Sequence, residues 1–395
     1  MNTRFAKTAA TLALALAFAF VLCLGVGAGD ARSQQTTTKA STQGQFSSKE
    51  ASTESEAPSI GARSWELVDV RSGEYLAGSN ASVRRPIASL TKIMVALVVL
   101  DNGDLNRRVS VSQKAASYAQ SLYSNVGLLP GDVLSVRELL MAALIPSGDD
   151  AVYALAQSEG DGSAENFVQK MNRKAKALGL KDTHFQNPIG LDARGNYSSA
   201  RDLATMTRLA LQNPEFRKIV STPSATISTQ DRQILLQNTN ELLSTYQPAI
   251  GVKTGTTPAA GRSLVASAAR GNESYIAVIL DDEGRFPDAA TMLDYGFAHY
   301  DRKKLVTAGK RYTSLDVPYH RDATVGLVAK KNVRALVEKN SDAKLDIEVT
   351  RNPPASAKRG QELGTITVRV GGKSVGESRL VARKGYEKAS VWRRV

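Results

Sequence analysis

A serine and a lysine stand three residues apart in the segment IASLTKIM, at the start of the apolar run VALVVL. On a helix, side chains at positions i and i+3 lie on one face, roughly 5–6 Å apart between their Cβ atoms. Burial of a lysine favours its neutral amine, which can accept a proton from a serine hydroxyl. Ser89 and Lys92 are therefore candidates for a nucleophile and its general base. The alternative is a serine that caps a helix and a lysine that is solvated at the surface.

Two later segments add polar residues of the same kind. The segment IPSGDDA places Ser147 and Asp149 in a loop between two expected helices. The segment GVKTGTT places Lys253, Thr254 and Gly255 on an expected strand, and Gly255 is interpreted as leaving the backbone open to a substrate chain. The order and spacing fit the set S-x-x-K, S-x-N or S-D-N, and K-T-G, which occurs in β-lactamases and penicillin-binding proteins.

On these motifs the chain resembles the serine D-alanyl-D-alanine carboxypeptidases, the low-molecular-mass penicillin-binding proteins. Further segments resemble the family and follow in its order, among them LLPGDVLSVRELLMAALIPSGDDA, YSSARDLATM and GVKTGTTPAAGRSLVASAAR. The resemblance covers about residues 62–310, and the β-rich tail is similar to the family's C-terminal domain. It implies a fold of the β-lactamase/transpeptidase type and no cofactor. It also implies peptidoglycan stem peptides as substrates and β-lactam antibiotics as covalent inhibitors.

The resemblance also implies catalytic roles for three side chains. Ser89 would be the acylated nucleophile and Lys92 its general base. Ser147 would relay a proton to the departing D-alanine. Water would then hydrolyse the acyl-enzyme.

The third motif is implied to bind the substrate. Lys253 and Thr254 would hold the terminal carboxylate, a task suited to an ammonium group and a hydroxyl. Gly255 and Thr256 would line the same place. The backbone N–H groups of Ser89 and Thr256 would form the oxyanion hole.

Asp149 departs from the family pattern, which usually has Asn at this position. An Asn amide can donate to a substrate carbonyl, whereas an ionised Asp can only accept hydrogen bonds. A carboxylate here also favours the charged form of Lys92, which opposes its role as a base. Asp149 could be protonated, or could pair mainly with Lys253. We hypothesise that Asp149→Asn raises the rate of acylation by penicillin.

Other functions stay open on the sequence. A β-lactamase or a DD-endopeptidase of the same fold is one alternative. The additional β-rich tail disfavours the lactamase, and so do the surroundings of Glu165, which do not match the deacylating glutamate motif of class A enzymes. A catalytically weak wall-binding or scaffold protein is the other alternative, and Asp149 is its main support.

Several other polar residues are given structural roles. We expect His184 to bond within its loop, Asp192 to be a loop residue, Asp202 to cap a helix and Arg262 to lie at the surface. The three histidines are scattered, and the only cysteine is Cys23, so neither a metal site nor a disulfide is predicted.

The order of the expected helices and strands predicts an α+β fold, in which helices pack on an antiparallel sheet and position these residues. The segments SWELVDV and RSGEYLAGSN form an early hairpin. From about residue 225 the pattern turns to strands, first ATIST and QILLQNT and then the three late strands GVKTGTT, RSLVASAAR and SYIAVIL. The stretch IASLTKIM opens a helix that runs to Asp101-Asn102-Gly103, and helical spacing also occurs in 135–145, 149–159, 164–180, 199–212 and 287–300. A catalytic domain is predicted over 62–310. Short strands separated by turn residues then predict a small all-β domain over 311–395.

The N-terminal segments and the net charge bear on localisation. Residues 1–28 have a basic start and an apolar stretch, which indicates a signal peptide or an uncleaved membrane anchor. Residues 29–61 are rich in Ser, Thr and Gln and are expected to form a flexible linker. The chain carries a net charge of +13, and residues 311–395 hold 18 Lys and Arg against 9 Asp and Glu. We therefore expect an exported protein at the outer membrane face or in the wall. Anionic membrane or wall polymers are its candidate partners, and nucleic acid is not.

Overall fold

The structure is a computed structural model that describes residues 57–320 and 322–388. The predicted signal peptide or anchor, and all but the last five residues of the predicted linker, lie outside the described residues. Among the residues described, no helix is both long enough and apolar enough to cross a bilayer.

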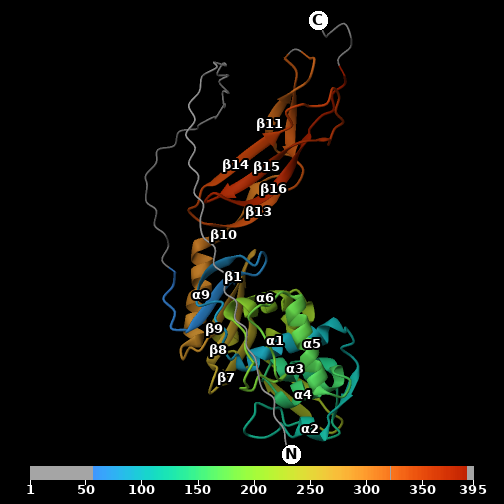
Figure 1. The fold of residues 1–395 in the computed structure, drawn as a ribbon, viewed down its shortest axis with the longest axis vertical. Coiled ribbons are helices and arrows are strands. Elements are labelled where there is room, and N and C mark those ends of the chain that lie inside the picture. Colours follow the sequence, from blue (N-terminus) through green and yellow to red (C-terminus); the bar gives the residue numbers. More distant parts are fainter. Residues whose placement is uncertain (1–56, 321, 389–395) are drawn as a thin grey trace, which may run out of the picture. The chain divides into compact units, whose positions relative to one another are not determined.

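A five-stranded antiparallel sheet forms the centre of the first domain, with the strand order β2-β1-β9-β8-β7 (Figure 1). Its strands are β1 (Ser64–Asp69), β2 (Tyr75–Ser79), β7 (Ala249–Thr257), β8 (Gly261–Arg270) and β9 (Glu273–Leu280). The early hairpin therefore joins the three late strands through the pairing of β1 with β9. This arrangement confirms the predicted α+β fold.

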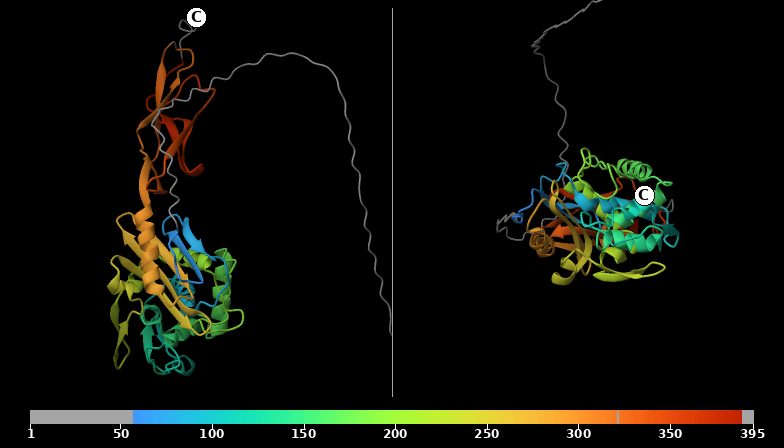
Figure 2. Two further views of the ribbon diagram at one scale, coloured as in Figure 1. Left: turned by 90° about the vertical axis from the view of Figure 1, so that its left-hand side faces the viewer. Right: turned by 90° about the horizontal axis from the view of Figure 1, so that it is seen from below.

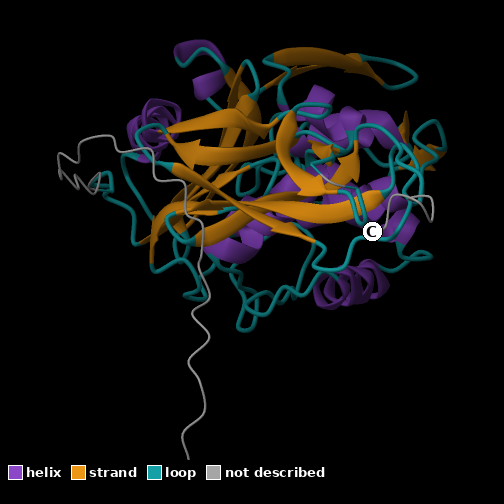
Figure 3. Cartoon of the chain, turned by 90° about the horizontal axis from the view of Figure 1, so that it is seen from above, coloured by secondary structure: helices purple, strands orange, loops and turns teal. Residues whose placement is uncertain are grey.

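Helices cover both faces of this sheet (Figure 2; Figure 3). Successive side chains of a strand point to opposite faces, so a strand covered on both sides is apolar throughout. In β9, Tyr275 and Ile279 belong to the core beneath one helix, α9 (Arg285–His299). Ile276 and Leu280 belong to the larger core shared with the remaining helices.

Five predicted helices lie here close to their predicted positions, and three shorter helices of four to seven residues were not predicted. Ser135 caps one of the predicted helices and shares a reciprocal pair of hydrogen bonds with Glu138. The elements are η1 (Ala88–Thr91), α1 (Lys92–Asp101), α2 (Gln113–Ala116), α3 (Val136–Leu144), α4 (Asp149–Glu159), α5 (Ala164–Ala177), α6 (Ala200–Ala210), α7 (Pro214–Val220) and α8 (Leu242–Thr245). Two small two-stranded sheets complete the domain: β3 (Arg108–Ser110) with β4 (Val133–Ser135), and β5 (Ser224–Ser228) with β6 (Gln233–Gln237).

The C-terminal part is built from strands, as predicted. A five-stranded sheet has the order β11-β12-β16-β15-β14, and β10 pairs with β13. The strands are β10 (Tyr300–Val306), β11 (Arg311–Asp316), β12 (Thr324–Ala329), β13 (Val333–Glu338), β14 (Ala343–Val349), β15 (Glu362–Val370) and β16 (Lys373–Ala382). The sequence analysis did not predict β10, which directly follows α9. Its pairing with β13 links it to the C-terminal strands, although it precedes residue 311.

Candidate active site

Ser89 lies in the 3₁₀ turn η1, immediately before α1. The buried side chains of Ile87 and Leu90 anchor this turn in the core. Ala88 has φ of 47°, a left-handed conformation that is strained for a residue with a Cβ atom. Such strain persists only where the surrounding structure holds it, and it concentrates at functional sites. The turn leaves Ser89 partly exposed beside the completely buried start of α1.

Lys92 is completely buried, which excludes the solvated lysine of the alternative interpretation. Its Nζ lies 2.6 Å from Oγ of Ser89, donates to Oδ1 of Asp149 at 2.6 Å and donates to the carbonyl of Ile189 at 3.2 Å. Burial lowers the pKa of Lys92, and the carboxylate of Asp149 opposes this shift without reversing it. The amine is thus held at the hydroxyl and its charged form is disfavoured, as a general base requires.

Ser147 and Asp149 occupy the loop between α3 and α4 and the first turn of α4. Ser147 has φ of 73°, and its buried Oγ has no hydrogen-bond partner among the described residues. Asp149 is the first residue of α4, where the helix dipole favours a carboxylate. Its ion pair is with Lys92, and no direct contact with Lys253 is found among the described residues. Ser147 is therefore a buried hydroxyl that is free to bond to a bound group.

Lys253 and Thr254 lie on β7, at the edge of the sheet. Nζ of Lys253 donates to the carbonyl of Thr254 at 3.0 Å, and the hydroxyl of Thr254 lies 2.6 Å from that of Thr239. Burial lowers the pKa of Lys253 well below its ordinary value, and the nearby charge of Lys92 adds to this shift. Binding an anion beside Lys253 would favour its charged form.

Gly255 connects the third motif to the nucleophile. A Cβ atom at this position would lie 2.9 Å from the carbonyl oxygen of Ile87 and 3.2 Å from the backbone nitrogen of Ser89. From its sequence, this glycine was expected to leave room for a substrate chain. The room is instead filled by the turn that carries Ser89, so the glycine allows β7 to approach η1.

Arg285, which the sequence analysis did not single out, also lies here. Its Nη1 donates to Oγ1 of Thr256 at 2.9 Å and to the carbonyls of Gly255 at 3.1 Å and Ser263 at 3.2 Å. Arg285 is the first residue of α9, where a positive charge interacts unfavourably with the helix dipole. A cation at the start of a helix is the sequence signal that points to a functional role for this residue. Arg262 forms an exposed ion pair with Glu283, as expected of a surface residue.

His184 and Asp192 have the structural roles that were predicted for them. Nδ1 of His184 lies 2.8 Å from the carbonyl of Gly195 within its own loop. Asp192 accepts hydrogen bonds from Oγ1 of Thr257 and from the backbone of Ala259, so it ties its loop to the end of β7.

The prediction that Asp202 caps a helix is wrong: Ser199 caps α6, and Asp202 lies in its first turn, where its carboxylate accepts hydrogen bonds from Asp182 and Thr183. Glu165 lies in the first turn of α5 and bonds to Ser163. Within the described ranges, no group of three or more His, Cys, Asp or Glu residues is placed to hold a metal ion.

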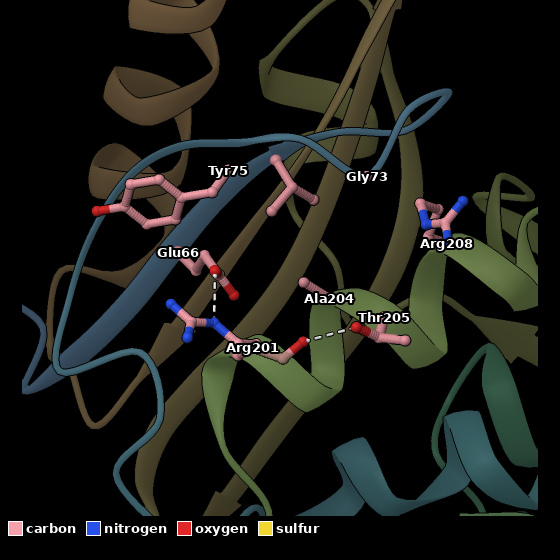
Figure 4. Close-up of a pocket in the computed structure, with 8 residues that line it drawn as sticks. Glu66, Gly73, Tyr75, Arg201, Ala204, Thr205 and Arg208 are labelled. Carbon is pink, nitrogen blue, oxygen red and sulfur yellow. Dashed lines mark hydrogen bonds and ion pairs between the residues drawn. The ribbon is translucent and has the colours of Figure 1, made fainter. Parts of the chain in front are cut away.

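A separate polar cavity of about 220 Å³ lies between the β1–β2 hairpin and α6 (Figure 4). Glu66 lines it and is only 2% exposed; Nε of Arg201 donates to its Oε1 at 3.3 Å. Burial raises the pKa of Glu66, and Arg201 opposes this shift. The cavity contains none of the motif residues, so the predicted chemistry belongs to the group around Ser89.

Comparisons with known proteins match both domains. Residues 51–284 match the family described as D-alanyl-D-alanine carboxypeptidase, and residues 300–388 match the C-terminal domain of penicillin-binding protein 5. The D-alanyl-D-alanine carboxypeptidase DacF of Bacillus subtilis is 35% identical over 83% of this chain and 86% of its own length. DacC of Escherichia coli is 35% identical over 86% of this chain and 88% of its own. The crystal structure of penicillin-binding protein 5 from Haemophilus influenzae superposes with a TM-score of 0.68 at 31% identity, covering 84% of this chain and 99% of that one.

Proposed function

The chain belongs to the D-alanyl-D-alanine carboxypeptidase family, and on this premise we propose that it removes the terminal D-alanine from peptidoglycan stem peptides through an acyl-enzyme at Ser89. One observation carries the assignment of residues: a buried amine, that of Lys92, lies 2.6 Å from the hydroxyl of Ser89. The same amine contacts the second motif through Asp149, and the third motif touches the backbone of Ser89 through Gly255.

In the acylation step, Oγ of Ser89 attacks the carbonyl carbon of the bond between the two D-alanines. Its proton passes to Nζ of Lys92, and the carbonyl oxygen becomes an oxyanion that we assign to the backbone N–H groups of Ser89 and Thr256. The C–N bond then breaks, and the departing amine of D-alanine receives a proton by way of Ser147. Its buried hydroxyl, without a partner among the described residues, supports this assignment.

We assign the terminal carboxylate of the substrate to Lys253 and Thr254, with Gly255 and Thr256 beside them. Arg285 adds a second positive charge at this place through its hydrogen bond to Thr256. A carboxylate bound here restores the charge of Lys253, which burial otherwise disfavours. Deacylation then follows when water attacks the ester carbon and the proton returns to Oγ of Ser89.

The function is tested by the release of D-alanine from diacetyl-L-lysyl-D-alanyl-D-alanine and by labelling with fluorescent penicillin. Ser89→Ala is expected to abolish both, whereas Ser82→Ala, an exposed serine of the same segment, is the matched control and retains both. Rapid turnover of a chromogenic cephalosporin without release of D-alanine would favour the lactamase. Absence of labelling in the wild-type chain would favour the scaffold protein.

We further propose that the enzyme is exported and acts at the outer face of the membrane or in the wall. The basic C-terminal domain supports contact with an anionic polymer there: Arg311, Arg383 and Lys384 line a hollow of about 280 Å³. Salt-sensitive binding to anionic vesicles or to wall polymer, lost when these three residues become Gln, is the expected result. N-terminal sequencing of the mature protein distinguishes a cleaved signal peptide from an anchor.

A further inference from the structure

The strand β14 is an edge of the C-terminal sheet (Figure 1). Every one of its residues is exposed. In the part of the chain that the structure describes, it pairs only with β15. Edge strands present unpaired backbone N–H and C=O groups and are able to accept a further strand. The outer edge of β14 is thus open to a partner.

One face of this edge strand is apolar. Leu345, Ile347 and Val349 alternate along it and are 40%, 37% and 37% exposed. Leu345 is paired with Val368, and Ile347 with Ile366; both of these β15 residues are completely buried in the domain core. Paired residues lie on the same face of a sheet. The apolar side chains of β14 therefore continue the apolar face of β15, and at β14 this face becomes exposed.

The charges of the other face are self-complementary. Lys344, Asp346 and Glu348 alternate with the apolar residues. If two copies of β14 run antiparallel about a two-fold axis at Asp346, Lys344 of each copy faces Glu348 of the other. In the same register Leu345 faces Ile347, so that apolar side chains meet apolar ones. From this complementarity we propose that two copies of the chain associate by pairing their β14 strands in this register.

The one like-charge pair in this register is already neutralised within each copy. The two Asp346 residues face each other at the axis, and like charges directly opposite are unfavourable. However, Nε of Arg369 lies 2.6 Å from Oδ2 of Asp346 in each chain. At the two-fold axis the two Asp346 carboxylates are therefore balanced by the guanidinium groups of the two Arg369 residues.

The pairing joins two five-stranded sheets into one of ten strands and covers both apolar strips at their edge. A contact limited to single strands is small compared with a stable interface, so the association is weak and depends on concentration. It involves no residue of the group around Ser89. The proposal is therefore independent of the proposed enzymatic function.

Sedimentation velocity of the full chain in a non-ionic detergent, over a range of concentrations, tests the association. Lys344→Glu puts two like-charged pairs into the interface, and we expect dimerisation to weaken at least roughly tenfold. Lys344→Glu combined with Glu348→Lys restores both opposite-charge pairs and should restore the wild-type association. Thermal unfolding followed by circular dichroism checks that each variant is folded. A monomer at every concentration, or a dimer that neither variant affects, would overturn the proposal.

Cysteine cross-linking tests the register in a Cys23→Ser background. In the proposed register, the cysteine of Asp346→Cys faces the same cysteine in the second chain at a Cα separation of about 4.5–5.5 Å, which is within the range of a disulfide. A covalent dimer is therefore expected on mild oxidation. Lys344→Cys alone lies roughly 13 Å from its copy, four residues along the strand, and should not cross-link. Lys344→Cys combined with Glu348→Cys should. Equal cross-linking of Asp346→Cys and Lys344→Cys would contradict the register.

Discussion

Replacing Asp149 by Asn removes one charge from the buried pair with Lys92 and keeps the size of the side chain. Asp149 opposes the effect of burial on the pKa of Lys92. Without its charge, Lys92 should lose its proton at a lower pH. If neutral Lys92 is the base that activates Ser89, acylation by penicillin becomes faster wherever protonation of Lys92 limits it.

The geometry of the pair sets the size of this effect. Nζ and Oδ1 are 2.6 Å apart, and only 0% and 9% of the two side chains are exposed. Removing one partner of a buried ion pair costs about 3–5 kcal/mol as long as the other stays charged. Lys92 avoids this cost by losing its proton, and a pKa shift of one unit corresponds to about 1.36 kcal/mol. A cost of about 3 kcal/mol, the lower end of the range, therefore moves the acidic limb of the pH–rate profile down by about two pH units.

The assay is the second-order rate constant of acylation by fluorescent penicillin, measured by stopped flow across the pH range. On the acidic side of the wild-type midpoint, Asp149→Asn should react roughly 10–100-fold faster. Asp202→Asn is the matched control, because it neutralises another buried carboxylate in the first turn of a helix, one that bonds to Asp182 and Thr183 and not to Lys92. An acidic limb that stays in place, with equal or slower acylation, would refute the role of Lys92 as the base restrained by Asp149.

Three further predictions concern other buried or half-buried polar groups. Ser147→Ala should slow acylation by about 10²–10⁴-fold and leave the melting temperature unchanged, since the buried Oγ has no partner to lose among the described residues; a large loss of stability would contradict this. Arg285→Ala should raise KM for the peptide by roughly 10–100-fold, whereas Arg262→Ala, at an exposed ion pair, should not change it. Because burial raises the pKa of Glu66, its contribution to stability is complete below the unfolded pKa and is lost as pH rises through the folded value. Calorimetry of Glu66→Gln should therefore show a larger gain in melting temperature at about pH 8 than at about pH 4, and the reverse order would exclude the burial effect.

Local sequence patterns were enough to predict most elements of the fold. The helical spacing of residues 135–145 placed α3 within one residue of its observed limits. Alternating apolar residues and turns predicted β1, β2 and the C-terminal strands β11 to β16. These signals are local, because capping, amphipathic spacing and turns depend on residues a few positions apart. β10 was missed because it follows α9 without a turn signal, and only its pairing with β13 identifies it as a strand.

The residue types of the site were also predictable from the sequence, since three short motifs carry them in a fixed order. The contacts between these residues were not predictable from it. Whether Asp149 pairs with Lys92 or with Lys253 depends on how α4 meets α1, and the sequence left both open. Arg285 reaches Thr256 because α9 begins beside β7, although the two residues are far apart in sequence.

The sequence by itself thus determined the elements and the chemical groups available, because both are properties of short segments. Tertiary structure decided which groups meet and in which direction their pKa values shift. Burial of Lys92 and Lys253 lowers the pKa of each, and that burial is created by helices and strands from distant parts of the chain. Gly255 shows the same dependence: its missing side chain is a local fact, and the turn of Ser89 that fills its place is brought there only by folding.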